Sequence, residues 1–450
     1  MSKTRVRLHF PTDRSVHIGD LRLALMTSLW TWSKGGTLVA TNDNASALED
    51  LAWLEVEPDE TLPVGGEKSA SEIIEELVAQ DKAYPCFCTP AELREMAAAP
   101  RGYREATLYD GRCRALSSDD QKALAKAGRK PSVRLRVSEI DLKGLNKTLT
   151  GYLPKQLHDF VIQEPDGTIT TEFAAALNDS EAGATHILLH SSDLTHLHQR
   201  VLIAQALGLK SPQFTTIADV EQVGGESSRW QTISHLRDTG FHPIAVRKAL
   251  LNAGWSKSGA GAVKDLAKDF KIAQVAKSVS AIDLDQLRED NSAVLQDMGD
   301  NDQVDAIFEH LARRGFAFEE RDKRWRKKFV DLVVEDLNTL ADAETMAGFV
   351  LTQGVSYDKR SAEQLREPTT QALIDTFEGC IKKGKTSSLK DWKGVFAKFR
   401  STVEIPGRSL AMIRLVLTGE RAGPNLAVLT TLLGEEGTRN RLEKARKYRS

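Results

Sequence analysis

His17 and Gly19 have the residue types and spacing of a phosphate site near the start of the chain. Apolar and polar residues alternate over 5–10 and leucines recur at helical spacing over 21–29, which predicts a strand, a loop and a helix. A helix beginning at Gly19 turns unpaired N–H groups and its positive dipole end toward the loop, which favours a phosphate. Gly19 allows close approach of the backbone, and His17 can donate to a phosphoryl oxygen. An ordinary capped loop has the same short pattern, so the motif alone leaves both interpretations open.

A second group with chemical potential is formed by Cys86, Cys88 and Cys113, while Cys380 lies far from them in the sequence. Zinc in proteins takes four ligands in a tetrahedron, so three thiolates need a fourth partner. Four cysteines do not make a disulfide framework in a chain of 450 residues. The pattern predicts either a metal site or three ordinary thiols.

The surrounding chain must position these groups, and its length is enough for about three domains. Strands and helices alternate up to about residue 235, and the rest of the sequence is almost entirely helical in pattern. Lys and Arg total 61 against 63 Asp and Glu, so any contact with nucleic acid must come from a local patch. No run of about 18 uncharged apolar residues occurs, and we expect a cytoplasmic protein with no membrane partner.

Several short segments follow one another in an order that chance would rarely produce. They are Arg7, His17 to Arg22, Gly35-Gly36, Lys82 to Pro90, Tyr109 to Arg114, Thr185 to Ile187, Ala206 to Leu209, Leu250 to Ser256, Leu417 to Gly419 and Gly423-Pro424. Together they resemble class I glutamyl-tRNA synthetases over essentially the whole chain. In that family a motif of the HIGH type serves ATP.

The resemblance implies a fold class and a domain organisation. Residues 1–235 are expected to form an α/β Rossmann-type class I synthetase catalytic core, with an inserted acceptor-binding subdomain at about 80–185. A helical stem-contact region is expected over 236–305, and an all-α anticodon-binding region over 306–450. The implied partners are tRNA and glutamate, and the implied cofactor is ATP with Mg²⁺. The protein is expected to be a monomer.

The resemblance also assigns roles to individual residues. His17 and Gly19 are implied to serve ATP, and Arg7 to face a substrate carboxylate. An arginine on an alternating strand is otherwise simply solvated. Many family members have a histidine where Ala115 stands, and Tyr109 is implied as a substitute fourth zinc ligand beside the three cysteines.

The amino-acid side of the expected site departs from the family pattern. Registering the sequence on Gly35-Gly36 places residues 41–44 where the family has Arg-Ile-Glu-Asp, so Asp43 replaces the glutamate expected to meet the substrate's amino group. Leu189 stands in place of an arginine and can form neither an ion pair nor a hydrogen bond. Two acids of the family are replaced by Ser191 and Ser192.

The phosphate loop departs further, because no lysine occurs between Lys210 and Lys248, where the family has its KMSKS-type motif. Arg229 is the only cation of that loop and can serve as a single phosphate clamp, whereas Glu226 would repel a triphosphate. Removing one preorganised charge at a developing oxyanion costs about 2.7 to 4 kcal/mol, although such losses are not additive.

Three functions therefore remain open. The first is ATP-dependent ligation of glutamate to tRNA, with Arg229 and Asp43 standing in for lost groups. The second is a catalytically inactive synthetase paralogue that binds tRNA or another protein in a regulatory role, and the third is activation of a different amino acid. Loss of the loop lysines argues against adenylate formation of any kind.

Two basic segments are candidates for RNA contact, and each has a plainer interpretation as a solvated helical face. Residues 323–328 place Trp325 within a cationic run, where the ring either stacks on a base or packs inward. The second segment holds the terminal cations, which are Arg439, Arg441, Lys444, Arg446, Lys447 and Arg449. His190, His196 and His198 are interpreted as surface histidines.

Overall fold

The computed structural model describes residues 3–8, 10, 16–41, 45–63, 68–98, 109–137, 145, 157–224, 232–255, 261–351 and 354–448. The chain divides into two compact units. The first comprises Met1–Ile233 with Arg247–Leu284, and the second comprises Ser234–Val246 with Asp285–Ser450. No helix within the described ranges is both long and apolar enough to span a bilayer.

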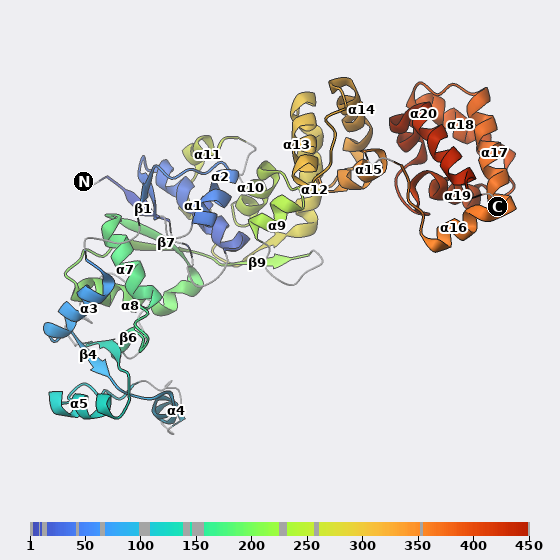
Figure 1. The fold of residues 1–450 in the computed structure, drawn as a ribbon. Helices are drawn as coiled ribbons and strands as arrows, with labels where there is room; N and C mark the ends of the chain where they lie inside the picture. The colour runs from blue at the N-terminus through green and yellow to red at the C-terminus, as the bar shows by residue number, and fades with distance from the viewer. Residues whose placement is uncertain are drawn as a thin grey trace. The chain divides into compact units, whose positions relative to one another are not determined.

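A parallel sheet of five strands forms the centre of the first unit, in the order β3-β2-β1-β7-β8 (Figure 1). Its strands are β1 (Arg5–Arg7), β2 (Thr37–Thr41), β3 (Glu60–Leu62), β7 (His186–His190) and β8 (Gln213–Ile217). All of their pairings are parallel. β2 is buried along its whole length, as expected for a strand with helices over both faces.

Helix α1 (Ile18–Ser33) follows β1 and is buried on every side over its first fourteen residues. The leucine pattern at 21–29 therefore continues into a helix that belongs to the core rather than to the surface. The other helices that lie wholly or partly in the first unit include α2 (Ala45–Trp53), α7 (Thr171–Glu181), α8 (Leu194–Ala206), α10 (Pro243–Asn252) and α11 (Val263–Asp269). A separate parallel pair joins β9 (Val220–Val223) to β10 (Ser280–Asp283).

The segment between β3 and β7 builds a small antiparallel sheet in the order β4-β5-β6 (Figure 1). Its strands are β4 (Ala83–Cys86), β5 (Ser132–Leu135) and β6 (Phe160–Gln163), and its helices are α3 (Ala70–Ala79), α4 (Pro90–Ala98) and α5 (Ser118–Lys126). Ile74, Ile162 and Phe173 share one hydrophobic core with Ile187 of β7. The small sheet is thereby packed against α7 and β7.

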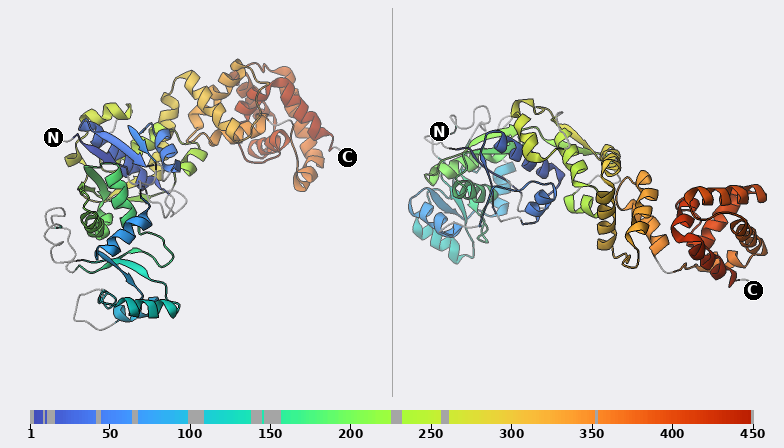
Figure 2. Two further views of the ribbon diagram at one scale, coloured as in Figure 1. Left: turned by 60° about the vertical axis from the view of Figure 1, so that its left-hand side comes forward. Right: turned by 90° about the horizontal axis from the view of Figure 1, so that it is seen from above.

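The described residues of the second unit form helices only, gathered over one core that extends from Leu295 to Ala445. The helices are α9 (Ile233–Asp238), α12 (Leu284–Asp297), α13 (Asp300–Arg313), α14 (Lys323–Val333), α15 (Asp342–Leu351), α16 (Lys359–Arg366), α17 (Pro368–Lys383), α18 (Leu389–Thr402), α19 (Pro406–Thr418) and α20 (Leu426–Arg446). Figure 2 shows α16 to α20 as a single bundle. Gly434 interrupts α20 with a left-handed φ of 73°, a conformation that favours glycine.

This architecture confirms the predicted fold class, a parallel α/β core followed by an all-helical region. The predicted boundaries at 235 and 305 stay a prediction. The division into compact units follows other boundaries: residues 234–246 belong to the second unit, and residues 247–284 belong to the first.

Candidate functional site

The N-terminus of α1 holds the two residues with which the sequence argument began. The helix begins at Ile18 with His17 as its N-cap residue, and Gly19 is buried in the first turn. The His17 backbone N–H donates to Asp20 Oδ2 at 3.0 Å, and His17 Nδ1 lies 3.3 Å from the same oxygen. The Asp20 side chain is only 8% exposed. A carboxylate of the chain itself therefore caps the helix end that was predicted to face a phosphate.

Arg7, the residue implied to face a substrate carboxylate, lies at the end of β1 and is buried. Its Nε donates to Asp179 Oδ1 at 2.8 Å, and its Nη1 donates to the Leu8 carbonyl at 3.2 Å. Arg200 Nε donates to the second oxygen of Asp179 at 2.7 Å. The three charged side chains are each at most 4% exposed. Burial alone would raise the pKa of Asp179, but Arg200 and Arg7 outweigh it and hold the pKa below its usual range.

The carboxyl ends of β7 and β8 carry the residues that replace the family's charged ones. Leu189 is buried in the core that β7 shares with α7 and α8, so it contributes packing. Ser191 Oγ donates to the Ile217 carbonyl at 3.0 Å, and Ser192 Oγ donates to Asp219 Oδ1 at 2.7 Å. These hydroxyls are used to fasten the end of β7 to the end of β8.

His190 is a correction to the sequence interpretation, because its side chain is only 13% exposed. Its Nδ1 lies 3.8 Å from Asp219 Oδ1, and its backbone N–H donates to Asp193 Oδ2 at 3.2 Å. Burial lowers the pKa of His190, while Asp193, Asp219 and Asp20 act in the opposite direction. The negative charge of Asp20 therefore reaches the same region as the acids that follow β7 and β8.

Arg22 is fully buried on α1 and is held by backbone oxygens. Its Nε donates to the Ala253 carbonyl at 2.6 Å, and its Nη1 donates to the Ala218 carbonyl at 3.3 Å. Burial lowers the pKa of Arg22 to about 10, with Asp219 acting in the opposite direction. Two predicted site residues, Asp43 and Arg229, lie outside the described residues.

The three predicted zinc-binding cysteines converge at the end of β4. The sulfur atoms of Cys86, Cys88 and Cys113 all lie within 4.8 Å of one another, and those of Cys88 and Cys113 are 3.6 Å apart. Tetrahedral zinc with bonds of about 2.3 Å separates its sulfur ligands by about 3.8 Å, so this spacing fits the ion. Tyr109 Oη lies close by and accepts the Cys113 N–H at 2.8 Å.

Arg134 contacts both Cys86 and Tyr109 of this group. Arg134 Nε donates to Cys86 Sγ at 3.3 Å, and its guanidinium lies 4.1 Å from the centre of the Tyr109 ring. Burial would raise the pKa of Cys86, but a backbone hydrogen bond from Cys88 and the Arg134 contact lower it overall. The arrangement favours a thiolate at Cys86, the form that binds a metal.

The cationic run at 323–328 is used largely inside the second unit. Trp325 stacks on Phe329 with ring centres 5.6 Å apart, and its Nε1 donates to the Leu432 carbonyl at 3.3 Å. Lys327 Nζ lies 2.6 Å from Asp300, and Lys328 Nζ donates to the Thr431 carbonyl at 2.9 Å. The inward interpretation of Trp325 is therefore confirmed.

Three of the terminal cations, Arg439, Arg441 and Arg446, are likewise used inside the second unit, whereas Lys444 and Lys447 are exposed. Arg441 is buried and donates to the Leu417 carbonyl at 2.6 Å. Arg439 pairs with Glu378 at 3.1 Å, and Arg446 pairs with Asp375 at 2.8 Å. These contacts fasten α20 to its neighbours.

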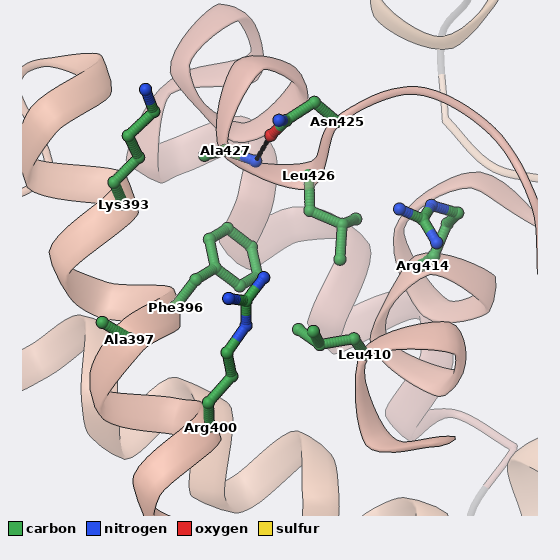
Figure 3. Close-up of a pocket in the computed structure, with 9 residues that line it drawn as sticks. All are labelled: Lys393, Phe396, Ala397, Arg400, Leu410, Arg414, Asn425, Leu426 and Ala427. Carbon is green, nitrogen blue, oxygen red and sulfur yellow. Dashed lines mark hydrogen bonds between the residues drawn. The ribbon is translucent and has the colours of Figure 1, made fainter. Parts of the chain in front are cut away.

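A pocket of about 430 Å³ in the second unit gathers cations that the sequence argument did not single out (Figure 3). It is lined by Lys393, Phe396, Ala397 and Arg400 of α18, Leu410 and Arg414 of α19, and Asn425, Leu426 and Ala427 at the start of α20. Arg414 donates to the Pro424 carbonyl at 3.3 Å. Lys393 and Arg400 are exposed, and within the described residues neither forms an ion pair or a hydrogen bond. The pocket thus combines an apolar floor with positive charge at its rim.

Comparison with known proteins assigns both parts of the chain. The model of the family "tRNA synthetases class I (E and Q), catalytic domain" matches residues 5–289, and that of the "Anticodon binding domain" matches residues 303–446. The chain belongs to the class I tRNA synthetases of the glutamate and glutamine type. It is a glutamyl-tRNA synthetase-like protein over its whole length.

Individual relatives agree with this assignment. The glutamate–tRNA ligase of Heliobacterium modesticaldum is 27% identical over 99% of this chain and 97% of its own length. That of Bacillus subtilis is 26% identical over 98% of this chain and 99% of its own length. A solved structure of a glutamate tRNA ligase from Elizabethkingia meningosepticum, in complex with its amino acid, has the same fold. Its TM-score is 0.64 at 20% identity, with 99% of both chains covered.

Proposed function

We propose that this chain is a tRNA-binding homologue of glutamyl-tRNA synthetase that does not form glutamyl-adenylate at a synthetase's ordinary rate. The observation that carries the proposal is the buried Arg7–Asp179–Arg200 network. Arg7 already holds a carboxylate of the chain, so a substrate carboxylate would have to displace Asp179 or bring a second negative charge beside it. Either event is costly in a buried site. Leu189 offers no replacement cation, because it is apolar and buried.

The phosphate side supports the same proposal from the sequence. ATP with Mg²⁺ would supply the activated phosphate of the ligase reaction. The lysines expected to stabilise the developing charge are missing between 210 and 248, which leaves Arg229 for that role. His17 then acts as the N-cap residue of α1.

The proposed partner is tRNA, and the pocket of α18, α19 and α20 supports it. A volume of about 430 Å³ accommodates an unstacked nucleobase, with Phe396 in the floor and Lys393 and Arg400 at the rim to meet phosphates. Arg326, Lys327 and Lys328 of α14 are engaged in the fold, whereas this pocket combines exposed cations with an apolar floor, so it offers the better contact.

Zinc is proposed as a structural ion of the inserted subdomain. Cys86, Cys88 and Cys113 would hold it, with Tyr109 as the nearest candidate for the fourth ligand. When bound, the ion would cross-link the end of β4 to the segment before α5. Arg134 would stabilise the Cys86 thiolate and orient the Tyr109 ring.

A working glutamate–tRNA ligase is the second candidate. It is favoured by His17 and Gly19, which occupy the cap and the first turn of α1 where the family serves ATP. In that case Arg229 and Asp43 would have to replace the lost charges. Activation of another amino acid would require the same phosphate chemistry, so one assay series addresses both.

Charging of total deacylated tRNA with labelled amino acids and ATP tests the catalytic part of the proposal. We expect no charging with glutamate or with any other amino acid, together with measurable tRNA binding in a filter assay. Charging that is lost in the variants His17→Ala and Arg229→Ala would refute the proposal in favour of a ligase.

The binding part has its own variants. Lys393→Ala with Arg400→Ala should weaken tRNA binding about tenfold or more, because a stacked or phosphate contact contributes about 1–3 kcal/mol. Lys398→Ala is the matched control, since it removes an exposed cation from the same helix outside the pocket lining. If the unmodified protein, the double variant and Lys398→Ala bind tRNA with equal affinity, the pocket is excluded as the site of tRNA contact.

A further inference from the structure

α20 consists of two helical segments joined at Gly434, and the first of them begins in the pocket of the second unit. Gly434 has non-helical backbone angles, with a φ of 73° and a ψ of 176°, which separate residues 426–433 from residues 435–446. We call residues 426–433 the pocket helix. Its start lines the pocket, where Asn425 Oδ1 accepts the Ala427 N–H at 2.9 Å (Figure 3). The pocket helix therefore forms one wall of the pocket that is the proposed tRNA contact.

The other end of the pocket helix is held by α14. The last four carbonyls of a helix have no partner within that helix, and the break at Gly434 creates such an end at residues 430–433. Lys328 Nζ donates to the Thr431 carbonyl at 2.9 Å, and Trp325 Nε1 donates to the Leu432 carbonyl at 3.3 Å. A cation also interacts favourably with the negative end of the helix dipole. Two side chains of α14 thus cap the pocket helix from outside.

The two residues of this cap are themselves held firmly. Trp325 stacks on Phe329 with ring centres 5.6 Å apart, and the Arg321 guanidinium lies 4.8 Å from the centre of the Trp325 ring. Phe329 is fully buried in the core of the second unit. The cap is therefore anchored to that core.

The pocket helix is short enough to pass a displacement from one end to the other. Eight residues at 1.5 Å each make a rod of about 12 Å. Thr430 is fully buried, and its Oγ1 donates to the Leu426 carbonyl at 2.9 Å, which ties the capped end to the end in the pocket. Loss of the cap should consequently shift the pocket wall.

We propose that Lys328 is a positioning residue for tRNA binding, because it fixes the capped end of the pocket helix and thereby holds the pocket wall opposite Phe396. The inference rests on the proposed function and deepens it, since it concerns the same pocket. It also gives part of the cationic run at 323–328 a role in RNA binding without contact between that run and the RNA.

The test is the affinity of the full-length Lys328→Met variant for total deacylated tRNA in the filter assay. Methionine keeps most of the apolar stem and removes the ammonium group. We expect the Kd to rise about fivefold, which corresponds to about 1 kcal/mol, because a displaced wall forfeits part of the stacking contact. Lys328→Arg keeps the cation and its donors, so its Kd should stay within about twofold of that of the unmodified protein.

Lys327→Met is the matched control. Lys327 is the preceding residue of the same helix, but its ammonium group lies 2.6 Å from Asp300 of α13. The substitution removes the same charge from α14 and leaves the cap in place, so the Kd should change less than twofold. A loss equal to that of Lys328→Met would show that the net charge of α14 sets the affinity, and the inference would be wrong.

The salt dependence separates positioning from a direct phosphate contact. Removing a lysine that binds a phosphate reduces the slope of log Kd against log salt concentration by about one. The slope for Lys328→Met should equal that for the unmodified protein. A slope reduced by about one would assign Lys328 to the RNA interface itself and overturn the inference.

A combination of variants separates positioning from a purely structural role. Added to Lys393→Ala with Arg400→Ala, Lys328→Met should raise the Kd less than about twofold further, because all three residues act through one pocket. A full additional fivefold loss would contradict this coupling. A Lys328→Met variant that melts at a lower temperature but binds tRNA with unchanged affinity would show that the cap only stabilises the fold.

The proposed function fails in a different way. If Lys393→Ala with Arg400→Ala leaves tRNA binding unchanged, the pocket is not the contact, and the positioning role is lost with it. If that double variant weakens binding and Lys328→Met does not, the tRNA contact stands and only the role of Lys328 is wrong.

Discussion

Replacing Asp179 with asparagine should destabilise the first unit strongly, because it leaves Arg7 and Arg200 buried without their shared carboxylate. All three side chains are at most 4% exposed. Removing one partner from a buried ion pair costs about 3–5 kcal/mol, since the remaining charge stays desolvated. We therefore expect the free energy of unfolding of the sheet of the first unit to fall by that amount.

Hydrogen exchange followed by mass spectrometry is the suitable assay, because it reports on β1 and β7 separately from the helices of the second unit. Peptides from α18 and α20 serve as the internal control and should not change. Asp269→Asn replaces an exposed aspartate of the same unit and should cost less than about 0.5 kcal/mol. A loss below about 1 kcal/mol in Asp179→Asn would refute the view that this carboxylate neutralises buried charge.

The pH dependence of the same variant gives an independent check. The pKa of Asp179 is held below its usual range, so its contribution is present above the pKa of the unfolded chain, about 3.9, and is lost as the pH falls further. The difference in stability between the unmodified protein and Asp179→Asn should therefore shrink below about pH 4. A double variant with Arg7→Met should cost less than the sum of the two single changes, because the two residues share one interaction.

Three further outcomes follow from other sites. Cys113→Ser should remove zinc from the purified protein, as measured by elemental analysis, and lower the melting temperature; a metal-free unmodified protein would contradict this. Burial raises the pKa of Glu172 to about 7, so its contribution to stability is full below about pH 4.5 and is lost as the pH rises to about 7. Glu172→Gln should consequently be more stable than the unmodified protein at pH 8, by up to about 3 kcal/mol in urea unfolding, and nearly equal to it at pH 4. Trp325→Ala should destabilise the second unit by about 3 kcal/mol, the low end of the range for an aromatic residue, because Trp325 is only partly buried. Lys327→Ala should alter tRNA affinity less than twofold in the filter assay.

The α/β core could be predicted from sequence because its signal is local. The alternation at 5–10, the leucines at 21–29 and the loop between them specify a strand followed by a helix without knowledge of any distant residue. The helical second half was equally visible in its periodicity. The sequence predicts that α1 begins at Gly19, one residue later than its observed start at Ile18. The exact end of a helix depends on the backbone angles of one residue, which a sequence pattern does not specify.

The network around Asp179 could not be predicted, because its partners are distant in sequence. One signal was available: on α7 the residues Phe173, Ala176 and Asp179 recur at helical spacing and all face the core. An acid on an apolar face indicates a buried partner, but not which one. Arg7 and Arg200 reach it only through the pairing of β1 with β7 and the packing of α8 on α7.

The cations of the second unit show a related limit. The cationic run at 323–328 suggests RNA binding in the sequence, yet Lys327 pairs with Asp300 and Lys328 donates to the Thr431 carbonyl within the unit. Lys393 and Arg400 attract no notice in the sequence, because the pocket that they border exists only when α18, α19 and α20 pack together. Asp43 and Arg229 remain predictions of the sequence alone.

Asp179 has a consequence for stability as well as for binding. A site built to bind an anionic substrate keeps positive charge uncompensated, and this costs stability in the unliganded protein. In the proposed function Asp179 supplies the missing anion from within the chain, beside Arg7. The carboxylate that is proposed to disfavour glutamate would therefore also stabilise the fold. Asp179→Asn should accordingly lose stability, and a variant that loses none would show that the aspartate only blocks the site.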